Sequence, residues 1–410
     1  MLFTAFEPSG DAHAAPVIAE LRRRRPDLRI HAWGGPRMES AGATIVERTS
    51  EDGVMGFAGF LKAFEMKRTI DRIDRWAAEH PVRLHIPVDS PSANFPVCKR
   101  LRVRGTRTIH YIAPKVWAWG ERRVRKLQRW SDHVLCILPF EPEWFGARGV
   151  EATYVGHPVV VKPIDEVAIA SQIERLPSGD PRIVVLPGSR SGEIAANLPA
   201  QLTAFAAVRK RFPKAAAVIL AANERIEARI RATVERRLGS MPPGVVIERG
   251  VLEAAIAWAD LAFATSGTVS LDLTRQACPM IGSYAIPGWQ MPIATTFVRA
   301  PFKLLPNIVE GEAVVPEFVP YAVGRGAAPI IEAAMPLLED RTRLDAMRQR
   351  LEQVRDRFAG VDPGPAAADA ILGLLDRWTS ESGGHTAMPT APTRPLRIEP
   401  GPEVVEDTVG

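Results

Sequence analysis

The opening stretch MLFTAFEPSGDAHAAPVIAEL (1–21) predicts a strand, a turn and a helix in direct succession. The apolar run 2–6 is typical of a buried strand, and the Ala-rich segment near 11–25 is typical of a helix. The turn between them holds the small or polar residues Glu7, Ser9, Gly10, Asp11 and His13. Such a turn offers backbone N–H groups to an anion, although Ser9 or Asp11 would also serve as a plain helix cap. We expect the end of a sheet strand with polar side chains beside it.

The same alternation continues along the chain. Further apolar runs lie at 29–34, 83–89, 108–113, 134–140 and 152–157, and then at 182–187, 215–223, 244–250 and 259–267. Arg- and Ala-rich helical stretches separate them. This rhythm predicts an α/β protein with mostly parallel sheets covered by helices on both faces.

The rhythm pauses at 161–181, which predicts a boundary between two α/β domains. We expect a first Rossmann-like domain at 1–163, a second at 164–345, and C-terminal helices at 346–378 that pack back toward the first domain. Residues 379–410 are rich in Pro, Ser, Thr and acids and lack apolar periodicity. They predict a disordered tail.

Composition limits the class of protein. The net charge of +5 favours phosphorylated ligands, an anionic membrane surface or nucleic acid, or else reflects a solvated helix face. The 3 cysteines form no CxxC pair, so we expect no metal site and reduced thiols in a cytoplasm. Glu7 and Asp11 argue against a signal peptide. Prolines interrupt the long uncharged run 276–298, which argues against a membrane helix.

Three more strand ends carry candidate site residues, and ligands of open α/β sheets bind beyond the carboxyl ends of strands. In PVDSPSANF (87–95), Asp89 is a candidate base and Asn94 lies near a helix start, or both only shape the turn. In LPGSRSGEI (186–194), Gly188, Ser189 and Arg190 form a compact anion site or a capped helix.

The last of these strand ends is ATSGTVSLDL (264–273). Its Ser266-Gly267-Thr268 turn again precedes a helix, where a diphosphate can bind. Asp272 lies one helical turn after Thr268 and could bind a ribose diol, or it is a surface residue. None of the four strand ends contains a G-x-G-x-x-G dinucleotide fingerprint or a GK[ST] phosphate loop.

Two apolar or aromatic stretches have alternative interpretations. HYIAPKVWAWGERRVRKL (110–127) mixes tryptophans with basic residues and could line a substrate site, meet a membrane edge or pack in the core. VMGFAGFLKAF (54–64) has phenylalanines at helical spacing, which suits a core helix or a membrane interface.

Taken together, these motifs resemble the lipid-A-disaccharide synthase family, inverting glycosyltransferases of the GT-B type. The resemblance runs from about 4 to about 375. It rests on EPSGDAH (7–13), GGPRM (34–38), VMGF (54–57), VDSPSANFPVCKRL (88–101), HYIAPKVWAW (110–119), ILPFEPEWF (137–145), YVGHP (154–158), LPGSR (186–190), SGT (266–268) and PNIVEGEAVVPEF (306–318).

The resemblance implies a GT-B architecture, with two Rossmann-like domains facing across a cleft and a C-terminal helix crossing back to the first. It implies transfer from UDP-2,3-diacylglucosamine to 2,3-diacylglucosamine 1-phosphate, with a β-1,6 link formed and UDP released in lipid A biosynthesis. It implies no metal and no cofactor, because helix dipoles and basic side chains offset the diphosphate. Implied too are a cytoplasmic location at the inner-membrane surface and no nucleic acid partner; a homodimer is left open.

The resemblance also distributes the site residues. Asp89, His13 and Glu7 are the catalytic candidates. The substrate-binding candidates are Ser9, Gly10, Asp11 and Asn94 on the acceptor side, and Gly188, Ser189, Arg190, Ser266, Gly267, Thr268 and Asp272 on the donor side.

This chain departs from the family pattern at several of these positions. Ser92 stands where the family has a second acid, Arg83 where it often has an aspartate, Phe6 where it has a glycine, and Asp272 where it has a glutamate. Because serine is no base at neutral pH, the base remains His13 or Asp89. Two alternatives stay open: a related glycosyltransferase with a different acceptor, and a non-catalytic protein that binds UDP-sugar or lipid.

Overall fold

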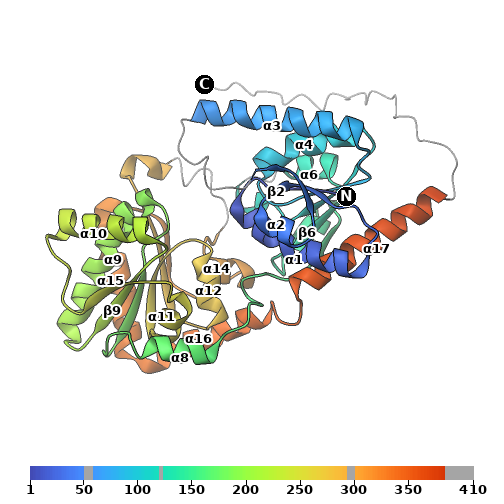
Figure 1. The fold of residues 1–410 in the computed structure, drawn as a ribbon. Helices are drawn as coiled ribbons and strands as arrows, with labels where there is room; N and C mark the ends of the chain where they lie inside the picture. Colours follow the sequence, from blue (N-terminus) through green and yellow to red (C-terminus); the bar gives the residue numbers. More distant parts are fainter. Residues whose placement is uncertain (50–58, 120–122, 293–300, 384–410) are drawn as a thin grey trace, which may run out of the picture. The chain divides into compact units, whose positions relative to one another are not determined.

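The structure is a computed structural model that describes residues 1–49, 59–119, 123–292 and 301–383. Its first half builds a parallel sheet of 7 strands in the order β3-β2-β1-β4-β5-β6-β7 (Figure 1). The strands are β1 (Leu2–Thr4), β2 (His31–Gly34), β3 (Thr44–Arg48), β4 (Leu84–Pro87), β5 (Arg107–Tyr111), β6 (His133–Cys136) and β7 (Ala152–Tyr154). This order winds one way from β1 to β3 and the other way from β4 to β7, as in a doubly wound fold.

Helices connect these strands. They are α1 (Pro8–Arg24), α2 (Pro36–Ser40), α3 (Gly59–Glu79), α4 (Pro91–Val103), α5 (Val116–Trp119), α6 (Val124–Trp130) and α7 (Glu141–Gly146). Helix α1 buries Ala14, Val17, Ile18 and Leu21, the spacing of one helical face. The α1 helix predicted from the opening sequence is therefore confirmed, with its start at Pro8.

The second half repeats the design with 6 parallel strands in the order β10-β9-β8-β11-β12-β13. They are β8 (Arg182–Leu186), β9 (Ala216–Ala221), β10 (Val245–Arg249), β11 (Leu261–Thr265), β12 (Met280–Ile286) and β13 (Glu317–Ala322). The helices are α8 (Glu166–Ile173), α9 (Ser191–Arg211), α10 (Glu224–Leu238), α11 (Leu252–Trp258), α12 (Val269–Arg275), α14 (Leu305–Glu310), α15 (Ala328–Glu339), α16 (Arg341–Asp356) and α17 (Pro363–Gly383), with short 3₁₀ turns at Gly288–Gln290 and Val323–Arg325. The expected α/β class with two parallel sheets is confirmed.

The topology also fixes where ligands can bind. In each sheet the winding direction reverses between two neighbouring strands, β1 and β4 in the first and β8 and β11 in the second. The chain leaves the carboxyl ends of such a pair in opposite directions, and this opens a crevice between the two loops. Those four loops are the four motifs singled out from the sequence.

Some expectations need correction. Strands β3, β12 and β13 were not predicted. The uncharged run 276–298 contains strand β12, and Met280 and Ile281 within it are buried, so core packing explains why this part of the run is apolar. Helix α17 continues to Gly383, so the first residues assigned to the disordered tail are helical; 384–410 lie outside the described residues. Part of the 54–64 stretch also lies outside them.

Contacts between the C-terminal chain and α1 lie within Met1–Ala370, which forms one compact unit. Asp369 pairs with Arg24 of α1, and a Cβ on Gly364 would lie 3.4 Å from Pro16 of the same helix. The domain boundaries themselves stay a prediction. The predicted 163/164 boundary falls between β7 and β8.

Candidate functional site

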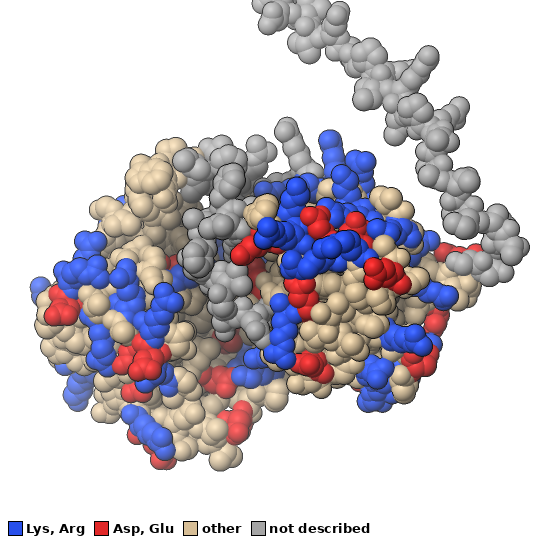
Figure 2. Space-filling model, turned by 45° about the horizontal axis from the view of Figure 1, so that its top comes forward, with Lys and Arg blue, Asp and Glu red and all other residues tan. Residues whose placement is uncertain are grey.

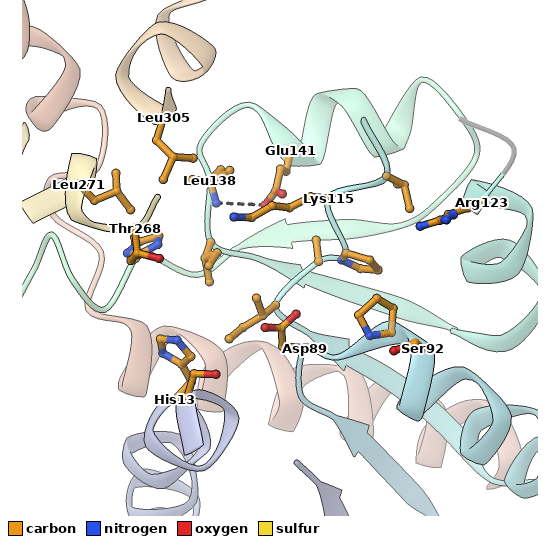
Figure 3. A pocket seen from close by; sticks show the side chains of 18 of the residues that line it. His13, Asp89, Ser92, Lys115, Arg123, Leu138, Glu141, Thr268, Leu271 and Leu305 are labelled. Atoms are coloured by element: carbon orange, nitrogen blue, oxygen red, sulfur yellow. Dashed lines mark hydrogen bonds between the residues drawn. The ribbon is translucent and has the colours of Figure 1, made fainter. Parts of the chain in front are cut away.

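The first crevice is a cavity of about 630 Å³ beside the carboxyl ends of β1 and β4 (Figure 3). Ser9 and His13 of α1 line it together with Asp89 of the β4–α4 turn and Ser92 of α4. Figure 3 shows the His13 ring and the Asp89 carboxylate both directed into the cavity. The structure thus brings together two of the three catalytic candidates. Thr268, Leu271 and Leu305 also contribute to the lining.

The turn that carries Asp89 has unusual backbone geometry. Asp89 and Ser90 have φ angles of 48° and 40°, the left-handed region that residues other than glycine rarely adopt. The Asp89 N–H donates to the carbonyl of Tyr111 at 3.0 Å. Strain of this kind persists only where surrounding contacts hold it, and it is common at functional sites.

Asn94 supplies much of that support. Its Nδ2 donates to the carbonyls of Val88 (3.1 Å) and Asp89 (2.7 Å), while its Oδ1 accepts the Thr4 hydroxyl at 2.7 Å. The Asn94 side chain is fully buried and does not line the cavity. These contacts favour a positioning role for Asn94 over the direct acceptor contact that we predicted.

Two more acceptor-side candidates are also engaged inside the protein. The Asp11 carboxylate accepts the backbone N–H groups of Gly35 (3.0 Å), Arg37 (3.1 Å) and Met38 (3.0 Å), and its side chain is only 3% exposed. It therefore caps the start of α2. Gly10 is buried where a Cβ would lie 3.1 Å from the Cβ of Ala5, so its small size lets α1 approach β1.

The remaining catalytic candidates differ in their surroundings. Glu7 is exposed at the start of α1 and is not among the residues that line the cavity. Burial lowers the pKa of His13 from 6.5, and the nearby Asp89 charge partly opposes that shift. The His13 imidazole is therefore neutral at pH 7, the state in which it can accept a proton.

The cavity is lined by further titratable residues that the sequence reasoning did not assign. They are Lys115, Arg123, Lys126, Glu141 and His157. Lys115, Glu141 and His157 each follow a strand of the first sheet within a few residues, which is the signal that could have identified them.

Glu141 is the most unusual member of this group. Its carboxylate accepts Trp117 Nε1 at 3.0 Å and the Leu138 N–H at 3.1 Å, as the dashed line in Figure 3 indicates for the latter. Burial raises the pKa of Glu141 to about 7, although these hydrogen bonds and the nearby Lys115 oppose the rise. Burial also lowers the pKa of His157 to about 3.

The second crevice is a cavity of about 500 Å³ beside the ends of β8 and β11. It brings together six predicted donor-side residues: Gly188, Ser189, Arg190, Ser266, Gly267 and Thr268. The cavity is also lined by apolar residues that the sequence reasoning did not assign: Leu186, Leu220, Ala221, Ala222 and Leu252. An apolar slot beside polar, glycine-containing turns suits a flat base attached to a phosphorylated sugar.

One predicted feature of this cavity is different in the structure. The backbone N–H groups of Ser189 and Arg190 donate to Oε2 of Glu193 at 3.1 and 3.2 Å, and Arg190 Nη1 donates to Oε1 at 2.7 Å. The carboxylate of Glu193 thus occupies the place where we expected a phosphate to meet the loop. The Arg190 side chain is 81% exposed and keeps donors free for a ligand.

Asp272 does not join this cavity. Its helix α12 follows the Ser266–Thr268 turn, but Asp272 is not among the residues that line either crevice. Burial raises its pKa, and the charges around it are those of Arg275, Lys162 and Glu253. The predicted ribose contact has no support in this geometry.

Within 1–49, 59–119, 123–292 and 301–383, no group of three or more His, Cys, Asp or Glu is arranged to hold a metal ion. No helix in the same part of the chain is long and apolar enough to cross a membrane.

Comparison with known proteins agrees with this geometry. The family model for lipid-A-disaccharide synthetase matches residues 1–358. The lipid-A-disaccharide synthase of Solibacter usitatus is 33% identical over 92% of this chain and 97% of its own length. That of Ruegeria pomeroyi is 34% identical over 90% of this chain and 94% of its own.

Among solved structures, the fold resembles an S. aureus MnaA–UDP co-structure with a TM-score of 0.59. The match has 10% sequence identity and covers 92% of this chain and 96% of the other, so it supports the fold alone. The family assignment rests on the sequence matches, which span both sheets and all four strand-end motifs. The chain belongs to the lipid-A-disaccharide synthetase family.

Proposed function

We propose that this glycosyltransferase of lipid A biosynthesis transfers 2,3-diacylglucosamine from UDP to the 6-hydroxyl of 2,3-diacylglucosamine 1-phosphate. The products are the β-1,6-linked disaccharide 1-phosphate and UDP. The observation that carries the proposal is the family match combined with His13 and Asp89 in one cavity at the switch point of the first sheet.

On the donor side, UDP binds in the 500 Å³ cavity of the second sheet. Leu186, Leu220 and Leu252 face the uracil, and the Ser266–Thr268 turn meets the diphosphate. The exposed guanidinium of Arg190 offsets the negative charge that grows on the departing diphosphate. Because Glu193 takes the backbone N–H groups, the Arg190 side chain supplies this contact.

On the acceptor side, the 6-hydroxyl oxygen attacks the anomeric carbon while the bond to UDP breaks on the opposite face. An α-linked donor then gives a β product through one inverting displacement, and one base removes the hydroxyl proton. His13 takes that proton. The Asp89 carboxylate, which favours protonated His13, stabilises the imidazolium that forms. The proton leaves to solvent once the products depart.

We also propose that the protein works at the inner-membrane surface, since both substrates carry acyl chains. Phe64 of α3 is 53% exposed, and the guanidinium of Arg68 lies 4.3 Å from the centre of its ring. Such a pairing of an exposed aromatic ring with a cation suits the headgroup region. On the face shown in Figure 2, Lys and Arg side chains are numerous but intermixed with acids.

Mass spectrometry of a reaction with both acylated substrates tests the function. The disaccharide phosphate together with UDP supports the proposal. A different glycolipid product from a panel of acceptors would show that the acceptor differs, as Ser92 and Arg83 could allow. Binding of UDP without any turnover would instead identify a non-catalytic homologue.

A further inference from the structure

The 630 Å³ cavity has positive charge that the proposed chemistry does not use. Arg123 and Lys126 both line it, one at the residue before α6 and the other within the first turn of that helix. Residues three apart at a helix start lie on one side of the helix. Arg125 and Arg129 of the same helix are also exposed but do not line the cavity. The two cations therefore face the acceptor space together.

Neither cation is neutralised by a neighbouring acid in the described part of the chain. Arg123 makes no hydrogen bond or ion pair with the described residues, and the Lys126 ammonium lies near the rings of Phe95 and Trp130, 5.9 Å from each ring centre. Other arginines of this half behave differently. Arg100, for example, pairs with Asp71 at 2.6 Å.

The third cation of the cavity has a different environment. The Lys115 charge acts on both Glu141 and His157 and helps to hold down the pKa of each. Figure 3 shows Lys115 beside Glu141, whereas Arg123 lies at the far side of the cavity. Arg123 and Lys126 are therefore the cations that remain available to a ligand.

We propose that Arg123 and Lys126 form a subsite for the phosphate monoester of the acceptor; this inference rests on the proposed function. Figure 3 places Asp89 between His13 and Arg123. A hexosamine 1-phosphate that presents its 6-hydroxyl to His13 and Asp89 can extend its phosphate toward Arg123. The guanidinium offers a two-pronged contact to phosphate oxygens, and the lysine adds a point charge.

The proposal accounts for specificity as well as binding. A phosphate held at the Arg123 end fixes which hydroxyl of the sugar reaches the base. An acceptor without the phosphate would lose that orientation, so its turnover should suffer along with its affinity.

Steady-state kinetics with two acceptors test the subsite: the 1-phosphate, and the same diacylglucosamine with a free anomeric hydroxyl. Arg123→Gln and Lys126→Gln should each raise the KM for the phosphorylated acceptor about 10- to 100-fold, the range for hydrogen bonds to a charged group. The KM for the UDP-sugar should not change. With the unphosphorylated acceptor, variants and wild type should be alike. Arg129→Gln, a matched exposed arginine on the same helix, should match wild type throughout.

Several outcomes would overturn the proposal. One is an unchanged KM for the phosphorylated acceptor, and another is an equal loss with both acceptors. A third is weaker binding of Arg123→Gln to phosphatidylglycerol vesicles while its acceptor kinetics stay normal, which would assign the cations to the lipid surface. The equilibrium affinities for the two acceptors, measured without the donor, test the subsite independently of turnover. An inactive wild type that still prefers the phosphorylated acceptor through Arg123 would thus contradict the proposed function but not the subsite.

Discussion

The carboxylate of Glu193 accepts Arg190 Nη1 at 2.7 Å and also the backbone N–H groups of Ser189 and Arg190. A carboxylate of the protein thus satisfies the donors that a strand–Gly–Ser–Arg turn would otherwise present to a phosphate. The same three contacts cap α9 and hold the Arg190 side chain in the lining of the 500 Å³ cavity. In the proposed function, the Arg190 side chain, and not the backbone of the turn, therefore binds the diphosphate.

Arg190→Gln should weaken UDP binding by about 1.5–3 kcal/mol, because one hydrogen-bonding charge on the diphosphate is lost. Isothermal titration with UDP measures this directly. Glu193→Gln should cost less, since the arginine remains but is less firmly held. Arg211→Gln, at the far end of the same helix, is the matched control and should bind UDP normally. If Arg190→Gln also binds UDP normally, the diphosphate lies elsewhere.

The base assignment predicts a specific pH profile. Since burial lowers the pKa of His13, turnover should fall on the acid side with an apparent pKa below 6.5, because protonated His13 cannot accept the hydroxyl proton. Asp89→Asn removes the charge that raises the pKa of His13, so the acid limb should move to lower pH. His13→Ala should cost on the order of 100-fold in kcat with UDP affinity unchanged. Normal turnover of His13→Ala would show that His13 is not the base and has only a structural role near the start of α1.

Ser92→Asp should raise kcat. It places a carboxylate in the cavity beside Asp89, where the family has its second acid. The added negative charge should also favour protonated His13 and move the acid limb to higher pH. Ser92→Asn introduces a side chain as large as aspartate but without its charge. It should neither raise kcat nor move the acid limb. Equal behaviour of the two variants would mean that a missing acid does not limit turnover.

Asn94→Ala should lower the free energy of unfolding by roughly 3 kcal/mol, because it strips hydrogen bonds from the buried Thr4 hydroxyl and from the Val88 and Asp89 carbonyls. The strained Asp89 turn should relax as well, so kcat should fall even where the variant is fully folded. Urea unfolding and kinetics below the transition separate the two effects. Ser92→Ala, exposed on the same turn, should change stability by less than about 0.5 kcal/mol.

Folding stability should decrease as the pH is lowered, because buried histidines resist protonation in the folded state. Burial lowers the pKa of His85, His110 and His157 to about 3, so below 6.5 the unfolded chain binds protons at these sites that the folded chain does not. Glu141 acts in the opposite sense, because its raised pKa of about 7 gives the folded state one extra proton between about 4.5 and 7. The histidines outnumber it, so stability should fall as the pH drops below 6.5, with a slope that approaches roughly 2.7 kcal/mol per pH unit near pH 5.

Urea titrations at several pH values between about 5 and 7 give this slope. His110→Gln should reduce it by roughly 1.4 kcal/mol per pH unit, the effect of one proton. Glu141→Gln should make it steeper by the same amount, since the opposing group is gone. Stability that does not vary with pH in this range would mean that these side chains do not keep their unusual protonation states.

The sequence alone determined the α/β class, the two sheets and the four strand-end turns whose residues line the two cavities. Alternating apolar runs and helical stretches carry that information locally, and glycine, serine and acidic residues after a strand mark its carboxyl end. It did not identify β3, whose residues are at most half-buried, β12, which lies inside a long uncharged run without clear boundaries, or β13, which comes after that run.

Only the tertiary structure decided which polar residues face a ligand and which serve the fold. Asp11 meets backbone N–H groups 24 to 27 residues away, and Asn94 meets Thr4 at a separation of 90. Arg123 and Lys126 line the 630 Å³ cavity, while Asp272 lies outside the 500 Å³ cavity. A polar residue after a strand looks the same in sequence whether its partner is a substrate or a distant backbone amide. The partner is fixed only when the sheet brings remote turns together, because hydrogen bonds depend on position in space and not on separation along the chain.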